Sequence, residues 1–216
     1  MRFSVNSTYK RIPVLICLLA MTGFSELSAQ SPALDELKER FKSGSVFSSD
    51  FTHLMMDSFT GEETTTNGKI WIGENSYRIE ADNQIMVVDG ELSRVYNRTR
   101  NRLIISHYIE DEDDYAPSRM LQGVDETYSV KQIEIQGGGT IIELSSDDPF
   151  SVFDEVSINL NESGLPVEIN ATDQAGNVIT TSFGNGKFIS YSDRNRIFEI
   201  QVPETAEVID LRYESQ

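Results

Sequence analysis

The feature that most constrains this chain is a long succession of short runs in which apolar and polar residues alternate, separated by tight turns. From residue 46 onward the hydrophobic period is two, as in Phe47, Phe51 and Met55, which indicates half-buried strands. Turns such as Asp89-Gly90 are too short to hold a crossover helix, so neighbouring strands are expected to be antiparallel. A twisted sheet with so many strands tends to curl or close to protect its edges. The pattern therefore predicts a curved sheet that encloses a cavity.

The expected strands occupy most of the chain. They are residues 46–55, 69–72, 77–81, 84–88, 94–96, 103–109, 128–135, 140–144, 156–160, 166–171, 178–183, 187–191 and 196–202. Further tight turns are expected at residues 163–164, 175–177 and 184–186, where glycine or asparagine is present. No fixed repeat or low-complexity stretch interrupts this pattern. We therefore expect a single domain over residues 30–216.

Two helical segments accompany the strands. Ser31-Pro32 is a typical helix start, and Leu34, Leu37 and Phe41 then fall on one face at helical spacing. This amphipathic helix is expected to cover one face of the sheet or plug its opening. An acidic run at residues 110–114 precedes a short helical turn at 118–122, and we interpret this run as a solvated excursion.

The amino terminus has the three-part layout of a secretory signal peptide. Basic residues including Arg2 precede an apolar stretch over residues 12–20, and Leu27-Ser28-Ala29 resembles a cleavage site. The apolar stretch is about half of the roughly 20 residues that a membrane-spanning helix needs. We therefore expect residues 1–29 to be removed on export. Cys17 lies inside that segment, so the mature chain is expected to contain no thiol.

Composition and motifs argue against several functions. The net charge of −17 is unfavourable for nucleic-acid binding, which needs surplus Lys and Arg. His53 and His107 have no partner at zinc spacing, and no Gly-x-Ser-x-Gly elbow or phosphate loop is present. We expect neither a metal nor a cofactor, and no enzymatic activity. A hydrolase that uses a spatial pair of carboxylates is the alternative, although nothing singles out such a pair.

The order of several fragments resembles the outer-membrane lipoprotein carrier family, the LolA-type periplasmic chaperones. The fragments cover nearly the whole mature chain and follow the family's order. They are Leu37–Phe41 with Phe47–His53, Gly68–Ile72, Tyr77–Glu80, Ile85–Gly90 with Val95–Asn97, Pro117–Leu121, and Phe198–Arg212. The family often carries Lys-Arg-Pro after its tryptophan strand, and its arginine helps to close a helical lid. Residues 73–75 are Gly-Glu-Asn here, and Ser93-Arg94 replaces the usual Leu-Trp.

The resemblance implies a fold that is mainly β with some α, an incomplete, half-open antiparallel β-barrel covered by helices around an apolar cavity. It implies a monomeric periplasmic carrier that binds the acyl chains of lipoproteins and transfers them from the inner to the outer membrane. Its partners would be acylated lipoproteins, an inner-membrane lipoprotein export complex, and an outer-membrane acceptor or the membrane itself. A specialised paralogue that carries other lipids, or a periplasmic lipoprotein-sensing regulator of the same fold, are the alternatives.

Candidate lipid-binding residues come from one or the other alternating strand face and from the short helix. They are Phe47, Phe51, Tyr77, Ile79, Met86, Val88, Tyr96 and Met120. Flexible Met side chains suit a cavity that must adapt to its ligand. An ordinary hydrophobic core explains each of these residues equally well, because aromatic residues on a concave sheet fill space with or without a ligand.

Overall fold

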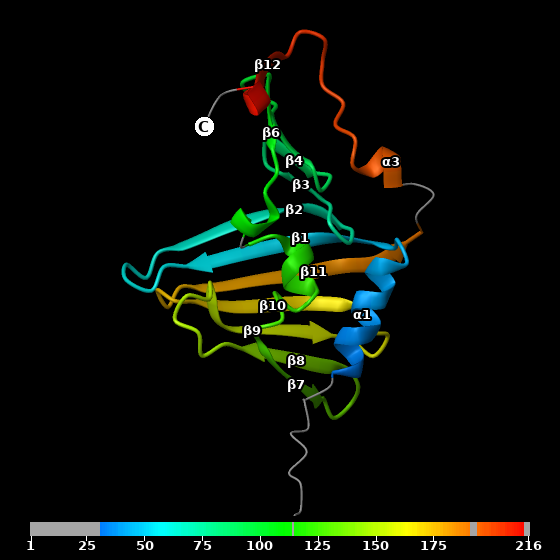
Figure 1. The fold of residues 1–216 in the computed structure, drawn as a ribbon, viewed down its shortest axis with the longest axis vertical. Helices are drawn as coiled ribbons and strands as arrows, with labels where there is room; N and C mark the ends of the chain where they lie inside the picture. The colour runs from blue at the N-terminus through cyan, green and yellow to red at the C-terminus, as the bar shows by residue number, and fades with distance from the viewer. Residues whose placement is uncertain (1–30, 114, 191–193, 214–216) are drawn as a thin grey trace, which may run out of the picture.

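A computed structural model describes residues 31–113, 115–190 and 194–213 (Figure 1). The expected signal peptide, residues 1–29, lies outside them. The helical elements are α1 (Pro32–Lys42), η1 (Glu110–Glu112), α2 (Pro117–Leu121), α3 (Arg194–Ile197) and η3 (Leu211–Tyr213). The strands are β1 (Val46–Met56), β2 (Glu63–Ile72), β3 (Tyr77–Ala81), β4 (Gln84–Val88), β5 (Leu92–Asn97), β6 (Arg102–His107), β7 (Ser129–Glu134), β8 (Thr140–Ser145), β9 (Phe153–Leu160), β10 (Pro166–Asp173), β11 (Val178–Ile189) and β12 (Glu207–Asp210).

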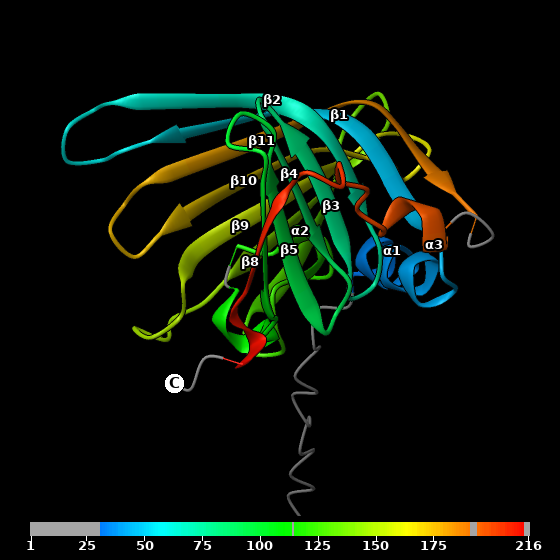
Figure 2. The same ribbon diagram turned by 90° about the horizontal axis from the view of Figure 1, so that it is seen from above.

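The strands form one sheet of 12 strands in the order β12-β6-β5-β4-β3-β2-β1-β11-β10-β9-β8-β7. The sheet curves without closing, since β7 and β12 lie at opposite ends of it (Figures 1 and 2). This confirms the expected half-open sheet covered by helices. All neighbouring strands are antiparallel except β12, which pairs in parallel with β6. No helix within the described ranges is long and apolar enough to cross a bilayer.

Helix α1 lies across the ends of the strands on the inner face of the sheet (Figure 1). Ser31 caps it, because its Oγ accepts a hydrogen bond from the Leu34 amide at 3.2 Å. Leu34, Leu37 and Phe41 are buried, which confirms the face that the sequence predicts. The ring of Phe41 lies edge-on to that of Phe188, with centroids 5.6 Å apart. The helix therefore closes one end of the main hydrophobic core.

The expected turn at residues 184–186 is wrong, because β11 continues through it. The pairing with β1 shifts there, from Ser48 opposite Lys187 to Asp50 opposite Gly184, which is a β-bulge. The Ser49 hydroxyl fills the irregularity by donating to the Gly184 carbonyl at 2.8 Å. A Cβ on Gly186 would lie 2.9 Å from the Phe47 ring, so glycine permits this close approach.

The expected strand at residues 196–202 is also wrong. After the short α3, the chain crosses the outer face of the sheet, where Phe198 joins a second core with Tyr96 and Leu103. The apolar alternation is real, but it reflects packing on a sheet face and not pairing at a sheet edge.

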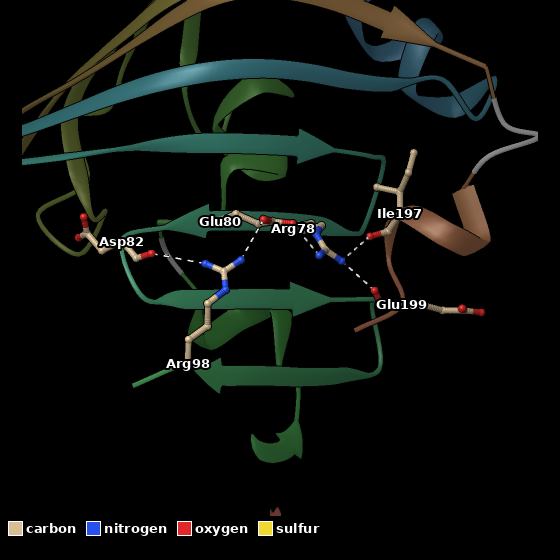
Figure 3. A network of polar contacts seen from close by, with 6 residues as sticks. All are labelled: Arg78, Glu80, Asp82, Arg98, Ile197 and Glu199. Atoms are coloured by element: carbon tan, nitrogen blue, oxygen red, sulfur yellow. Dashed lines mark hydrogen bonds and ion pairs between the residues drawn. The ribbon is translucent and has the colours of Figure 1, made fainter. Parts of the chain in front are cut away.

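One guanidinium holds this outer segment in place (Figure 3). Arg78 donates to the carbonyls of Ile197 at 3.1 Å and Glu199 at 2.7 Å. It also pairs with Glu80 at 2.6 Å and lies over the Trp71 ring. The side chain of Arg78 therefore provides hydrogen bonds that a neighbouring strand would otherwise supply.

Candidate ligand cavity

An apolar cavity of about 310 Å³ lies on the inner face of the sheet, beneath the segment that connects β6 to β7. Its volume falls at the lower end of the range of small-molecule sites. The apolar part of its wall consists of Phe51, Ile70, Tyr77, Ile79, Met86, Tyr115, Pro117, Met120, Ile169, Ile179 and Phe183. The polar part consists of His53, Thr66, Asp113 and Thr181.

Strand pairing explains why these side chains converge. Tyr77 lies opposite Val88, and Ile79 lies opposite Met86, so these four side chains share the inner face. Phe51 reaches the same face from β1, and its partner on β2 is Gly68. A Cβ on Gly68 would collide with the Glu80 carbonyl and lie 3.0 Å from the Phe51 ring. Glycine at this position therefore permits both the strand spacing and the position of the ring.

Residues 108–113 and 115–122 cover the cavity as a lid that includes η1 and α2. A hydrogen bond fastens it to β3, since the Tyr77 hydroxyl donates to the Asp113 carboxylate at 2.6 Å. Burial raises the pKa of Tyr77, and the hydrogen bond to Asp113 raises it further. Burial and the Asp113 charge also raise the pKa of Tyr108, whose ring lies edge-on to Tyr77. The Tyr77 phenol therefore stays protonated and donates to the Asp113 carboxylate, and the Tyr108 ring packs against it.

Two further contacts hold the carboxyl-terminal half of the lid. The Gln122 side-chain amide donates to the Glu74 carbonyl at 2.7 Å. The Tyr115 ring lies edge-on to Phe153, with centroids 5.3 Å apart and planes at 90°. Half of the Tyr115 surface nevertheless remains exposed, at 50%. The lid thus has a buried underside and one partly open border at Tyr115.

His53 provides a polar group in the cavity wall. Its Nδ1 lies 2.9 Å from the Thr181 hydroxyl, and burial lowers its pKa. The ring is therefore neutral at pH 7. A catalytic triad requires a carboxylate that is hydrogen-bonded to the histidine, and no such bond to this ring is found in the described part of the chain. Within the described residues, no cluster of three or more His, Cys, Asp or Glu could hold a metal ion.

A larger hollow of about 580 Å³ lies on the outer face of β7–β11. The strand registers place Lys131, Glu143, Ser157 and Asn170 side by side on that face. Lys131 pairs with Glu143 at 2.9 Å, so part of this polar surface is already satisfied internally. The lining of this hollow is about as polar as it is apolar, whereas the inner cavity is mostly apolar, so the inner cavity is the better candidate site for an apolar ligand.

The structure brings five of the predicted residues together in the cavity wall, namely Phe51, Tyr77, Ile79, Met86 and Met120. Three others lie elsewhere. Phe47 is fully buried and packs edge-on to Phe183, and Val88 is buried against Ala116 beneath the lid. Tyr96 lies on the outer face because it pairs with Ile85, and its hydroxyl donates to Asn101 at 2.8 Å.

Several wall residues are not predicted from the sequence. Ile169, Ile179 and Phe183 belong to alternating strands, so the same period-two signal could have placed them on the inner face. Asp113 belongs to the acidic run, whose composition predicts a solvated loop. No local pattern indicates its bond to Tyr77, because the two residues are far apart in sequence.

No family model matches the chain, and no curated protein matches it. An uncharacterised conserved protein from Thermus thermophilus aligns with a TM-score of 0.51 and 11% identity, over 82% of this chain and 96% of that chain. A LolA superfamily protein from Nitrosomonas europaea aligns with a TM-score of 0.40 and 12% identity, over 78% and 96%. A putative outer membrane lipoprotein-sorting protein domain from Vibrio parahaemolyticus gives 0.39 and 11%, over 77% and 97%. At these identities the likeness concerns the fold alone.

Proposed function

We propose that this protein is a carrier that shields an acyl chain from water in the cavity beneath the lid. The observation that carries the proposal is a largely apolar cavity of about 310 Å³, partly covered by a segment with its own polar fastening. Burying each methylene is worth about 0.8 kcal/mol, so a long acyl chain in water strongly favours such a cavity. The wall also contains Met86 and Met120, whose flexible side chains adapt to different ligands.

The cavity size sets the amount of ligand that the closed protein holds. If a methylene occupies about the volume of a water molecule, roughly 30 Å³, a cavity of about 310 Å³ accommodates about ten such groups. That corresponds to most of one acyl chain. A lipoprotein with two or three chains would need more apolar surface than this cavity provides, and movement of the lid away from the sheet would expose more of it.

The sequence resemblance supports the finer proposal that the cargo is an acylated lipoprotein in the periplasm. The expected signal peptide supports the same location. On this proposal the chain receives cargo from an inner-membrane export complex and delivers it to an outer-membrane acceptor or to the membrane, and it acts as a monomer without a cofactor or turnover. Its strongly negative net charge, −17 for the full sequence, disfavours direct adsorption on an anionic bilayer and favours protein-mediated delivery.

A fluorescent fatty-acid probe tests the proposal. Ile79→Glu places a carboxylate in the cavity wall, and we expect it to weaken probe binding at least tenfold. Ile135→Glu is the matched control, because Ile135 is 42% exposed and does not line the cavity. Both variants must retain the circular dichroism spectrum of the wild type. Equal probe binding by Ile79→Glu and the wild type would contradict the proposed site.

A further inference from the structure

Three connections meet at the end of the sheet where β1, β8 and β10 finish (Figures 1 and 2). They are residues 57–62, 146–152 and 174–177, which we call the three-loop rim. Hydrogen bonds join them, since Ser58 donates through its amide to Asn177 at 3.0 Å and through its hydroxyl to the Ala175 carbonyl at 2.7 Å. The Gln174 side chain donates to the Ser151 hydroxyl at 3.3 Å. The three loops therefore form one connected surface.

Two phenylalanines project from this rim almost completely into water. Phe59 is 96% exposed and Phe150 is 92% exposed. Each lies beside an aspartate that fixes its turn. The Asp57 carboxylate accepts from the Phe59 amide at 3.0 Å, and the Asp148 carboxylate accepts from the Phe150 amide at 2.9 Å. These rings are thus presented on ordered turns, and such exposed aromatic residues are typical anchors of protein interfaces.

The rim carries only one sign of charge. No Lys or Arg occurs in residues 54–63, 146–156 or 172–179. The acidic residues within five sequence positions of the two rings are Asp57, Glu62, Glu63, Asp147, Asp148, Asp154 and Glu155. An anionic bilayer repels such a surface, and protein segments that lie on membranes are instead rich in Lys and Arg. The charge therefore favours a basic protein surface over a membrane.

The rim also lies close to the open border of the cavity. His53 lines the cavity from β1, and Asp57, the first residue of the rim, follows directly after the end of the same strand. At about 3.3 Å per residue, the separation along the strand is roughly 13 Å. The half-exposed Tyr115 lies edge-on to Phe153, which directly follows rim residues 146–152, so a ligand that leaves beside Tyr115 would emerge next to a partner on the rim.

We propose that the three-loop rim docks a partner protein that presents Lys and Arg side chains around an apolar pocket, with Phe59 and Phe150 as the anchors. This interface goes beyond the carrier function and does not depend on it, since the rim shares no residue with the cavity wall. Where both hold, the interface places the partner at the cavity border for cargo exchange.

Photo-crosslinking in the living host tests the interface. The probe p-benzoylphenylalanine is placed at position 59 or 150 in the full chain. The control carries it at position 213, because Tyr213 is also an exposed aromatic residue, at 82%, and belongs to η3 and not to the rim. We expect positions 59 and 150 to capture the same protein at a basic segment of its sequence, and position 213 not to capture it.

Charge reversal provides the second measurement. Glu62→Lys and Glu63→Lys leave both rings and both aspartate turns in place, so we expect them to reduce the adduct at least tenfold. The purified charge-reversal variants should bind the captured partner at least tenfold more weakly than the wild type does. Added salt should weaken the wild-type complex. Any of four results would overturn the proposal. They are the absence of a protein adduct, the formation of lipid adducts alone, the capture of different proteins at the two positions, and an adduct that survives charge reversal.

Discussion

The hydrogen bond between Tyr77 and Asp113 offers a direct way to perturb the lid while the aromatic ring of Tyr77 stays in the cavity wall. Tyr77→Phe removes only the hydroxyl that donates to the Asp113 carboxylate at 2.6 Å. The ring, its burial and its edge-on contact with Tyr108 are retained. We therefore expect the sheet to keep its fold while residues 108–122 open more often.

The expected size follows from the chemistry of this bond. A hydrogen bond to a charged group contributes about 1.5–3 kcal/mol. Since about 1.4 kcal/mol corresponds to a factor of ten, the opening equilibrium of the lid should rise roughly 10- to 150-fold. The Tyr108 ring still packs against residue 77, and the Gln122 and Tyr115 contacts also hold the lid, so we expect a result in the lower half of that range.

Native-state hydrogen exchange measures this opening. Amides of residues 110–121 should exchange faster in Tyr77→Phe by that factor, while amides of β8–β10 should be unchanged. Tyr96→Phe is the matched control, because it removes a hydroxyl from a buried tyrosine of the same sheet on the opposite face. Unchanged exchange in the lid of Tyr77→Phe, or equal acceleration in Tyr96→Phe, would refute the assignment of this bond as the fastening of the lid.

Substitutions at four other positions test the packing and the ionisation. Phe41→Ala should lower the free energy of unfolding by about 3–5 kcal/mol in urea titrations, because the ring is fully buried. Gly68→Ala should cost about 1–3 kcal/mol by the same assay, since its Cβ meets the neighbouring backbone. Arg78→Ala should speed proteolysis within residues 197–206, and Arg78→Lys should restore protection only partly, because Lys cannot bond two carbonyls as a fork. The pKa of His53 is depressed in the folded state, so the unfolded chain binds its proton more readily and stability falls as pH drops through the ordinary value of 6.5. In His53→Gln the loss of stability between pH 7 and pH 5 should be smaller.

Much of the site could be predicted from alternation alone. In β3 and β4 the sequence predicts one apolar face, and Tyr77, Ile79 and Met86 do share it. In β5, Val95 and Tyr96 are both apolar, so the period does not determine which one faces inward. The register decides, because Ile85 opposite Tyr96 places that ring on the outer face. The register between strands is set by tertiary contacts. Where two adjacent residues of a strand are both apolar, the sequence alone does not show which of them faces the core.

The remaining differences also arise from long-range contacts. The apolar alternation at residues 196–202 predicts a strand, yet the segment is bound on a sheet face by Arg78, which is distant in sequence. Glycine and asparagine at 184–186 predict a turn, but a continuous partner strand converts them into a bulge. Asp113 lies in an acidic run typical of a solvated loop, and only the folded lid brings it to Tyr77.

The central claim is that the cavity beneath the lid binds acyl chains, and native mass spectrometry with lipid extraction tests it most directly. The protein is purified from its own host without detergent, alongside Ile79→Glu. We predict that the wild type carries an acylated species, either a lipoprotein or another lipid, and that Ile79→Glu carries at least tenfold less. A wild-type protein that is empty and also fails to take up a fatty-acid probe would contradict the claim.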